Sequence, residues 1–151
     1  MEFVKMEAYH VEAVAELEKM CFCDPWSAHS IASELENPLS YWLVAVENGI
    51  VCGYIGSQSV LDGADMMNIA VHPNYRRRGI GYSLIEKLIA VLTQRHVISL
   101  SLEVRISNES AISLYKKMGF AVVGKRPAYY RNPREDAYIM RKEFAECIFL
   151  Q

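Results

Sequence analysis

The sequence predicts a single domain of the α/β (α+β) class, in which a mixed central sheet is flanked by helices. Three observations predict this fold. Strand and helix patterns alternate along the 151 residues, turn signals join three early strands into an antiparallel meander, and a strand, a helix and another strand follow one another between Met66 and Val104. A chain of this length buries roughly 68 to 70% of its unfolded surface as one domain, so its core requires no disulfide or metal. We therefore expect residues 1–151 to form one domain, with residues 146–151 as a C-terminal tail.

The first part of the chain predicts a short strand and two helices. Phe3 to Met6 suits a strand, and a mostly apolar stripe at helical spacing then predicts a helix. The stripe consists of Val11, Val14, Ala15, Leu17, Glu18 and Cys21. A turn at residues 24–27 follows, and Ser27 is a natural N-cap for a second helix that runs to Glu36, where an Asn-Pro pair stops it.

The meander comes next. Strands over Tyr41 to Val46 and Ile50 to Val60 are joined by Asn48-Gly49, the strongest short hairpin signal. Asp62-Gly63 then joins the second strand to a third, from Ala64 to Val71. We expect these strands to be antiparallel neighbours.

A helix follows the meander and runs to about Arg95, because apolar residues recur at helical spacing from Ile80. Val97 to Val104 is another strand, so this segment is a strand-helix-strand crossover. Asn108 or Ser107 caps a last helix that ends near Met118. Two closing strands, over residues 120–124 and 137–144, are expected on either side of a polar loop.

Composition excludes several classes of protein. The chain has no apolar run of the roughly 20 residues that a membrane span needs, and its first residues lack the pattern of a signal peptide. The net charge of −2 argues against binding of a nucleic-acid backbone. The four cysteines and four histidines show no spacing typical of a metal site. We expect a cytoplasmic protein with no metal, no membrane association and no nucleic-acid partner.

The most informative motif is Arg76-Arg77-Arg78-Gly79-Ile80-Gly81, between a strand pattern and a helix pattern. The first N–H groups of a helix lack partners and its dipole is positive there, so glycines at this point let an anion such as a pyrophosphate approach. The letters match neither a nucleotide P-loop nor a dinucleotide fingerprint. The alternative reading is a basic turn whose arginines are merely solvated.

Two side chains are candidates for acid-base chemistry. Alternation in the strand from Val97 places Glu103 on its polar face, near the end where α/β sheets commonly bind ligands, so Glu103 could act as a general base. It could equally be a surface carboxylate paired with Arg105 or another neighbour. Spacing in the last helix points Tyr115 inward, where its hydroxyl is either a proton donor or a group bonded within the core.

The chain resembles the GNAT family of N-acetyltransferases, and within it the RimI-like, ribosomal-protein-alanine N-acetyltransferase subfamily. The glycine motif is similar to the family's acetyl-CoA pyrophosphate loop, and the order of elements is similar to the acyl-CoA N-acyltransferase fold over almost the whole chain. The segments that carry the subfamily resemblance are Pro25-Trp26-Ser27, Asn68-Ile69-Ala70-Val71, Leu102-Glu103-Val104-Arg105, Asn108, Ala111, Leu114-Tyr115, Gly119-Phe120, Tyr129-Tyr130 and Glu135-Asp136-Ala137.

This resemblance implies an acetyl-CoA-dependent enzyme that transfers acetyl directly, with Glu103 as the base and Tyr115 as the acid that protonates the coenzyme A sulfur. The cofactor-binding residues that it implies are Ile69, Ala70, Val71, Arg77, Arg78, Gly79, Ile80, Gly81, Tyr82, Asn108 and Tyr115. Cys21 and Cys52 are conceivable nucleophiles, but no paired histidine accompanies them.

The implied acceptor is the N-terminal alanine of small-subunit ribosomal protein eighteen. An α-amino group, with a pKa of about 7.7 to 8.0 against about 10.4 for lysine, is also the easier amine to neutralise. Trp26, Tyr129 and Tyr130 are candidates for holding the peptide, although each could equally be a packing residue. The alternatives are an acetyltransferase for a small amine or a lysine side chain, and a coenzyme A sensor without activity.

Overall fold

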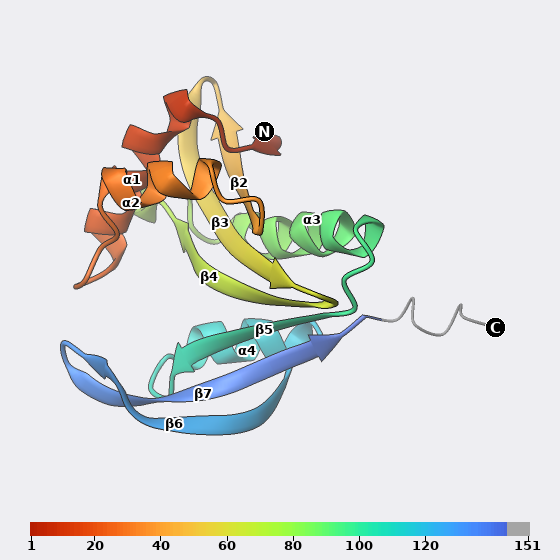
Figure 1. Cartoon of the computed structure of the whole chain (residues 1–151). Coiled ribbons are helices and arrows are strands. Elements are labelled where there is room, and N and C mark those ends of the chain that lie inside the picture. Colours follow the sequence, from red (N-terminus) through yellow and green to blue (C-terminus); the bar gives the residue numbers. More distant parts are fainter. Residues whose placement is uncertain (145–151) are drawn as a thin grey trace.

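The computed structural model describes residues 1–144 and contains one seven-stranded mixed sheet in the order β1-β2-β3-β4-β5-β7-β6 (Figure 1). The strands are β1 (Glu2–Lys5), β2 (Ser40–Glu47), β3 (Ile50–Val60), β4 (Gly63–Val71), β5 (Ser99–Arg105), β6 (Ala121–Arg131) and β7 (Arg134–Glu143). The helices are η1 (Ala8–His10), α1 (Val11–Cys21), α2 (Ala28–Leu35), η2 (Pro73–Tyr75), α3 (Ile80–Gln94) and α4 (Glu109–Lys117). The predicted fold class is therefore confirmed, whereas the tail expected at residues 146–151 lies outside the described residues.

The sheet separates in the middle. β4 and β5 are parallel and pair only at Gly63↔Ser99, Ala64↔Leu100 and Asp65↔Ser101. Beyond these pairs, β4 remains paired with β3, and β5 with β7. Figure 1 shows the two halves of the sheet diverging from this point, with α1 and α2 beside the first half and α4 against the second. Residues of β4 and β5 on the two sides of this separation line one cavity.

Two apolar cores hold the layers together. One face of β2 and β3 packs on α1 and α2 through side chains that include Val14, Trp42 and Tyr54. The opposite face packs on α3, whose buried Leu84, Ile85, Leu88 and Leu92 recur at helical spacing, and this second core continues to α4 and β5. β2 and β3 therefore lie between the two cores, and their central residues are buried on both faces of the sheet.

The turns and caps follow the sequence closely. Asn48 and Gly49 both have positive φ (52° and 78°), as a two-residue hairpin turn requires. The next turn is shifted by one residue from the prediction, because Gly63 already pairs with Val60 and Leu61 takes the positive φ. Ser27 Oγ accepts a hydrogen bond from Ser30 N at 3.0 Å, so the predicted cap of α2 is confirmed.

The end of the chain differs from the prediction. The expected polar loop between residues 124 and 137 is instead the continuation of a long hairpin, in which β6 and β7 turn at Asn132-Pro133. Register shifts between Val122 and Gly124 and between Arg126 and Tyr130 interrupt β6, and most of this strand is exposed. Regular apolar alternation is therefore missing, which is why the sequence pattern indicated a loop.

We predict that Gly56→Ala strongly destabilises the fold. Gly56 lies opposite Trp42 in the β2-β3 register, and a Cβ at residue 56 would lie 2.3 Å from Trp42 Cε2. Relief of such an overlap typically costs about 1 to 3 kcal/mol of unfolding free energy, which urea denaturation would measure. Gly81→Ala is the matched control, because its Cβ would be 3.8 Å from the nearest side chain. Equal stability of the two variants would contradict the prediction.

Candidate active site

A cleft of about 590 Å³ opens where β4 and β5 separate. Its walls come from β4, the end of β5, α4, the loop between α1 and α2, and the tip of the β6-β7 hairpin. The sequence-predicted residues that line it are Trp26, Ile69, Glu103, Asn108, Tyr115, Tyr129 and Tyr130. The fold therefore brings the candidate base, the candidate acid and all three candidate peptide contacts to one site.

Glu103 lies on the polar face of β5, as predicted, while Leu100, Leu102 and Val104 are buried on the other face. Its Oε2 accepts a hydrogen bond from Arg126 Nε at 3.1 Å. The partner is thus Arg126 on β6, which the surface-carboxylate alternative allowed as another neighbour, and not Arg105, which pairs with Glu135. The two side chains are 25% and 53% exposed, so this ion pair is open to solvent and competitors.

Tyr115 is buried, with 6% of its surface exposed, and packs against Phe120 at a centroid distance of 5.7 Å. This confirms the predicted inward orientation. Burial raises the pKa of Tyr115 to about 12, so the phenol keeps its proton throughout the neutral range. No described residue forms a hydrogen bond with the Tyr115 hydroxyl, and this oxygen is not fully enclosed by protein atoms. The hydroxyl is thus available to a ligand in the cleft.

Arg105 fixes the hairpin tip that closes one side of the cleft. Its guanidinium forms an ion pair with Glu135 at 3.1 Å and donates hydrogen bonds to the carbonyl oxygens of Asn132 and Pro133 at 3.1 and 2.8 Å. It also lies over the Tyr130 ring, 4.3 Å from the centroid. Sequence reasoning missed this role, because the contact joins residues 27 to 30 positions apart.

The second carboxylate of the hairpin, Asp136, holds the irregular part of β6. Its Oδ1 accepts a hydrogen bond from Ala128 N at 2.7 Å, and this bond lowers the pKa of Asp136. Ala128 has a positive φ of 51°, and the residues between Arg126 and Tyr130 leave the regular register here. The bulge places Tyr129 and Tyr130 at the cleft, with their rings perpendicular and 5.0 Å apart.

The glycine motif forms the N-terminus of α3. Gly79 is the N-cap with φ of 77°, and Ser83 N donates the first helical hydrogen bond to Gly79 O at 3.0 Å. The N–H groups of Ile80, Gly81 and Tyr82 are the unpaired donors of the first turn. No side chain of residues 1–144 caps them, so they suit an anion.

All three arginines before α3 are exposed, but two of them also form hydrogen bonds within the protein. Arg78 forms two hydrogen bonds with Glu47, at 2.7 and 3.1 Å, and these bonds raise the pKa of Arg78. Arg76 Nε donates to Val71 O at 3.2 Å, whereas Arg77 is exposed and has a positive φ of 66°. These contacts hold the loop in shape before any ligand binds.

The exposed edge of β4 is the remaining part of the cleft. Ile69 lines the cavity, Ala70 and Val71 pair with β3, and in the described chain none of these residues pairs with β5. Alternate backbone groups along this edge can therefore bond to an extended ligand. Asn108 lies across the gap, where its Oδ1 caps α4 by accepting from Ala111 N at 3.2 Å.

The candidate cysteine nucleophiles lack the required environment. Cys52 is fully buried, and this burial raises the pKa of its thiol. Cys21 lines the cleft, but its nearest polar partners are Val71 O at 3.9 Å and Arg76 Nη2 at 3.6 Å rather than a histidine base. Within residues 1–144, no group of three metal-binding side chains is positioned to hold an ion.

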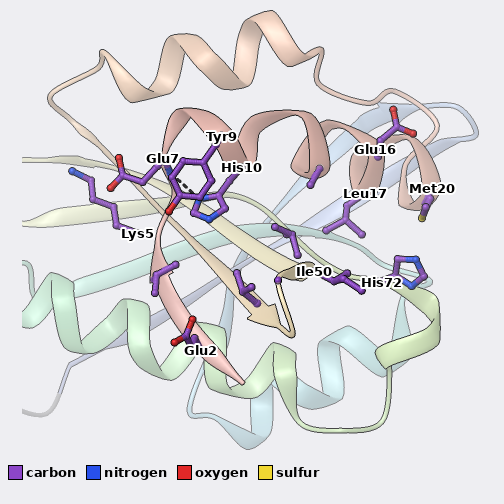
Figure 2. Close-up of a pocket in the computed structure, with 15 residues that line it drawn as sticks. Glu2, Lys5, Glu7, Tyr9, His10, Glu16, Leu17, Met20, Ile50 and His72 are labelled. Carbon is purple, nitrogen blue, oxygen red and sulfur yellow. Dashed lines mark hydrogen bonds between the residues drawn. The ribbon is translucent and has the colours of Figure 1, made fainter.

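A second cavity of about 720 Å³ lies between β1, α1 and the β2-β3 hairpin. Figure 2 shows that Glu2, Lys5, Glu7 and Glu16 lie around this cavity and do not converge on one point. None of the candidate acid, base or cofactor residues lines it. We therefore place the active site in the smaller cleft.

No helix in the described part of the chain is long and apolar enough to cross a membrane.

Known proteins match this chain in sequence. Residues 11–120 match the acetyltransferase (GNAT) family. Over 138 residues the chain is 41% identical to the ribosomal protein bS18-alanine N-acetyltransferase of Escherichia coli K12, which covers 89% of this chain and 92% of that protein. The Haemophilus influenzae enzyme of the same name is 39% identical over 140 residues, or 90% of this chain and 94% of that one.

The solved structures lead to the same conclusion. The crystal structure of the Escherichia coli ribosomal-protein-alanine N-acetyltransferase has a TM-score of 0.88 and 36% identity, covering 95% of this chain and 93% of that one. The resemblance stated from the sequence is therefore confirmed. With sequence and fold in agreement over most of its length, the chain belongs to the acetyltransferase (GNAT) family.

Proposed function

We propose that this enzyme transfers acetyl from acetyl-CoA to the α-amino group of the N-terminal alanine of ribosomal protein bS18. The observation that carries the proposal is that Glu103 and Tyr115, from different elements, line one cleft at the gap between β4 and β5. The names of the relatives support the acceptor, since the Escherichia coli and Haemophilus influenzae proteins are named for this alanine.

The described residues suit acetyl-CoA. Uncapped N–H groups at Ile80, Gly81 and Tyr82 would hold its pyrophosphate, with the backbone of Arg77 to Gly79 shaping the loop. The free edge of β4 at Ile69 to Val71 would bind the pantetheine arm, and Asn108 would contact it from the other side. Bound acetyl-CoA supplies the activated acetyl thioester.

Glu103 would act as the base in this reaction. The incoming amine must lose a proton before its nitrogen attacks the carbonyl carbon, and the carboxylate of Glu103 would accept that proton directly or through a water molecule. Its Oε1 accepts no hydrogen bond from the described residues, so one oxygen is free while Oε2 holds Arg126. The substrate ammonium would compete with Arg126 for this carboxylate, because both are cations.

Tyr115 would donate its proton toward the sulfur as the carbon-sulfur bond breaks. With a pKa of about 12, Tyr115 is a weaker acid than a thiol of pKa about 8.5. It therefore keeps its proton in the ground state and gives a hydrogen bond that strengthens as negative charge develops on sulfur. This differential effect favours the transition state.

The same cleft suits a peptide N-terminus. Trp26, Tyr129 and Tyr130 line it together with Glu103, and burial raises the pKa of Tyr130 to about 12, so its hydroxyl also remains a neutral donor. An α-amino group is neutralised about 2.5 pH units more readily than a lysine side chain, which matches a base as modest as a single glutamate. We therefore favour α-amino over lysine acceptors.

We predict that Tyr115→Phe lowers kcat by roughly a hundredfold, because proton donors of this kind typically contribute that much or more. The dissociation constant of acetyl-CoA, measured by calorimetry, should hardly change. In the wild type, ionisation of Tyr115 would remove the donor, but its pKa of about 12 places that loss well above neutrality. Wild-type kcat should therefore show no decline between about pH 7 and about pH 10. An unchanged kcat in the variant would remove the acid role.

A second prediction concerns the phosphate cradle. A Cβ at residue 81 would lie 3.8 Å from Leu114 Cδ2 and 4.0 Å from Val71 Cγ2, so Gly81→Leu would extend between the two sides of the gap. We expect the acetyl-CoA dissociation constant to rise at least tenfold, about 1.4 kcal/mol. Thermal unfolding serves as the control for folding. A folded variant with unaltered affinity would disprove the cradle assignment.

The acceptor is tested with two peptides. One begins with a free alanine and contains internal lysines, and its twin has a blocked N-terminus. After incubation with acetyl-CoA, mass spectrometry should find acetyl only on the free α-amino group. Lysine labelling on both peptides would assign the acceptor to side chains. Binding of acetyl-CoA without labelling of either peptide would redirect the search to small amines or to a sensor role.

A further inference from the structure

Behind the cleft lies a carboxylate that the acid-base mechanism does not use. Glu18 on α1 is fully buried and accepts hydrogen bonds from three separate segments. Its Oε1 accepts from Trp26 N at 2.9 Å, and its Oε2 accepts from Asn68 Nδ2 at 2.7 Å and from the hydroxyl of Tyr54. Two of these donors, Trp26 and Asn68, belong to residues that line the cleft.

A stack of aromatic rings connects Trp26 to Tyr54 through Trp42. The Trp26 ring packs edge-on against Trp42 at 5.5 Å, and Trp42 stacks on Tyr54 at 5.8 Å with an interplanar angle of 8°. Tyr54 then returns to Glu18 through its hydroxyl. Trp26 is therefore held twice, through its backbone N–H by Glu18 and through its ring by Trp42.

The hydrogen bonds to Glu18 must offset the free-energy cost of burying its carboxylate. Burying a carboxylate is costly unless its oxygens are hydrogen-bonded, and removal of one partner from such a site leaves the other groups unsatisfied. Within the described part of the chain, Glu18 bonds to a backbone N–H, an amide and a phenol and to no cation. The buried carboxylate therefore requires all three donors to be in place, and the carboxylate in turn holds these donors in position.

We propose that Glu18 is a positioning residue that fixes the α1-α2 side of the acceptor cleft by holding the Trp26 backbone and the Asn68 side chain at one point. It is not a catalytic residue, because it has no exposed surface through which it could touch a substrate. The kinetic part of this inference rests on the proposed function. The structural part, the fixation of Trp26, does not.

The test variant is Glu18→Gln. A glutamine keeps an oxygen for Trp26 N, but its amide nitrogen would replace the oxygen that now accepts from both Asn68 Nδ2 and the Tyr54 hydroxyl, so both bonds are lost unless Asn68 and Tyr54 reorient to accept instead. With the alanine peptide, we expect KM to rise at least tenfold, kcat to change less than threefold, and the acetyl-CoA dissociation constant to stay within twofold of the wild type. The matched control is Val14→Ala, since Val14 is fully buried on the same helix and in the same core. That variant should lose stability without raising KM.

Tryptophan fluorescence supplies a readout that does not depend on activity. Trp26 and Trp42 are the two tryptophans of the chain. Trp42 is only 3% exposed, so quenching by acrylamide reports mainly on Trp26. We expect the quenching constant of Glu18→Gln to rise about twofold and that of Val14→Ala to match the wild type.

A double variant distinguishes loss of the Glu18–Asn68 contact from a general folding defect. Asn68→Asp alone would place two carboxylates at hydrogen-bond distance, whereas Glu18→Gln with Asn68→Asp restores one donor and one acceptor with their places exchanged. The double variant should recover quenching and thermal stability toward wild-type values, which is the coupling expected of directly bonded partners.

Equal quenching in Glu18→Gln and Val14→Ala, or a double variant no better than the sum of its parts, would overturn the positioning role. A wild type that acetylates no alanine peptide would instead overturn the proposed function, while the quenching comparison would still decide the role of Glu18.

Discussion

The parallel pairing of β4 with β5 lasts for three residue pairs and then stops, and the cleft exists because of this limit. Continued pairing would close the edge of β4 and bring the end of β5 against it. β4 stays paired with β3, and β5 with β7. The separation therefore leaves without a strand partner only the backbone N–H and C=O groups that face the gap. These are the groups that an extended ligand can satisfy, so the site combines an open strand edge with a nearby helix N-terminus.

Helices pack on the sheet on both sides of the gap. α3 packs on the first half of the sheet through a continuous apolar face, and the same core extends to α4 and β5 in the second half. Glu103 and Tyr115 are therefore carried by elements that share one core with the glycine loop. By contrast, two segments that line the cleft, the α1-α2 loop and the hairpin tip, are held in part by polar contacts of Glu18, Arg105 and Asp136. The elements that carry Glu103 and Tyr115 thus rest on apolar packing, whereas the α1-α2 loop, the hairpin tip and the arginine loop before α3 also depend on polar contacts between distant residues.

This division explains how much the sequence could predict. The glycine loop, the orientation of Glu103 and the burial of Tyr115 all follow from local periodicity, and the structure agrees with each of them. The partner of Glu103 could not be predicted, because Arg126 comes from a strand whose irregular register conceals it. Glu18 appeared in the sequence as one member of an apolar helical stripe. A charged residue in such a stripe was the available signal, but its three donors are brought together only by the tertiary fold.

The interruptions of β6 have a further consequence for the behaviour of the protein at high concentration. β6 is one edge of the sheet, and an unbroken exposed edge of 11 residues would be a template for pairing with a second molecule. Its bulges, together with Lys125, Arg126 and Pro127, break the row of backbone donors and acceptors that such pairing needs. The opposite edge, β1, has only four residues. The irregularity that directs two tyrosines to the cleft thus also protects the sheet against edge-to-edge aggregation.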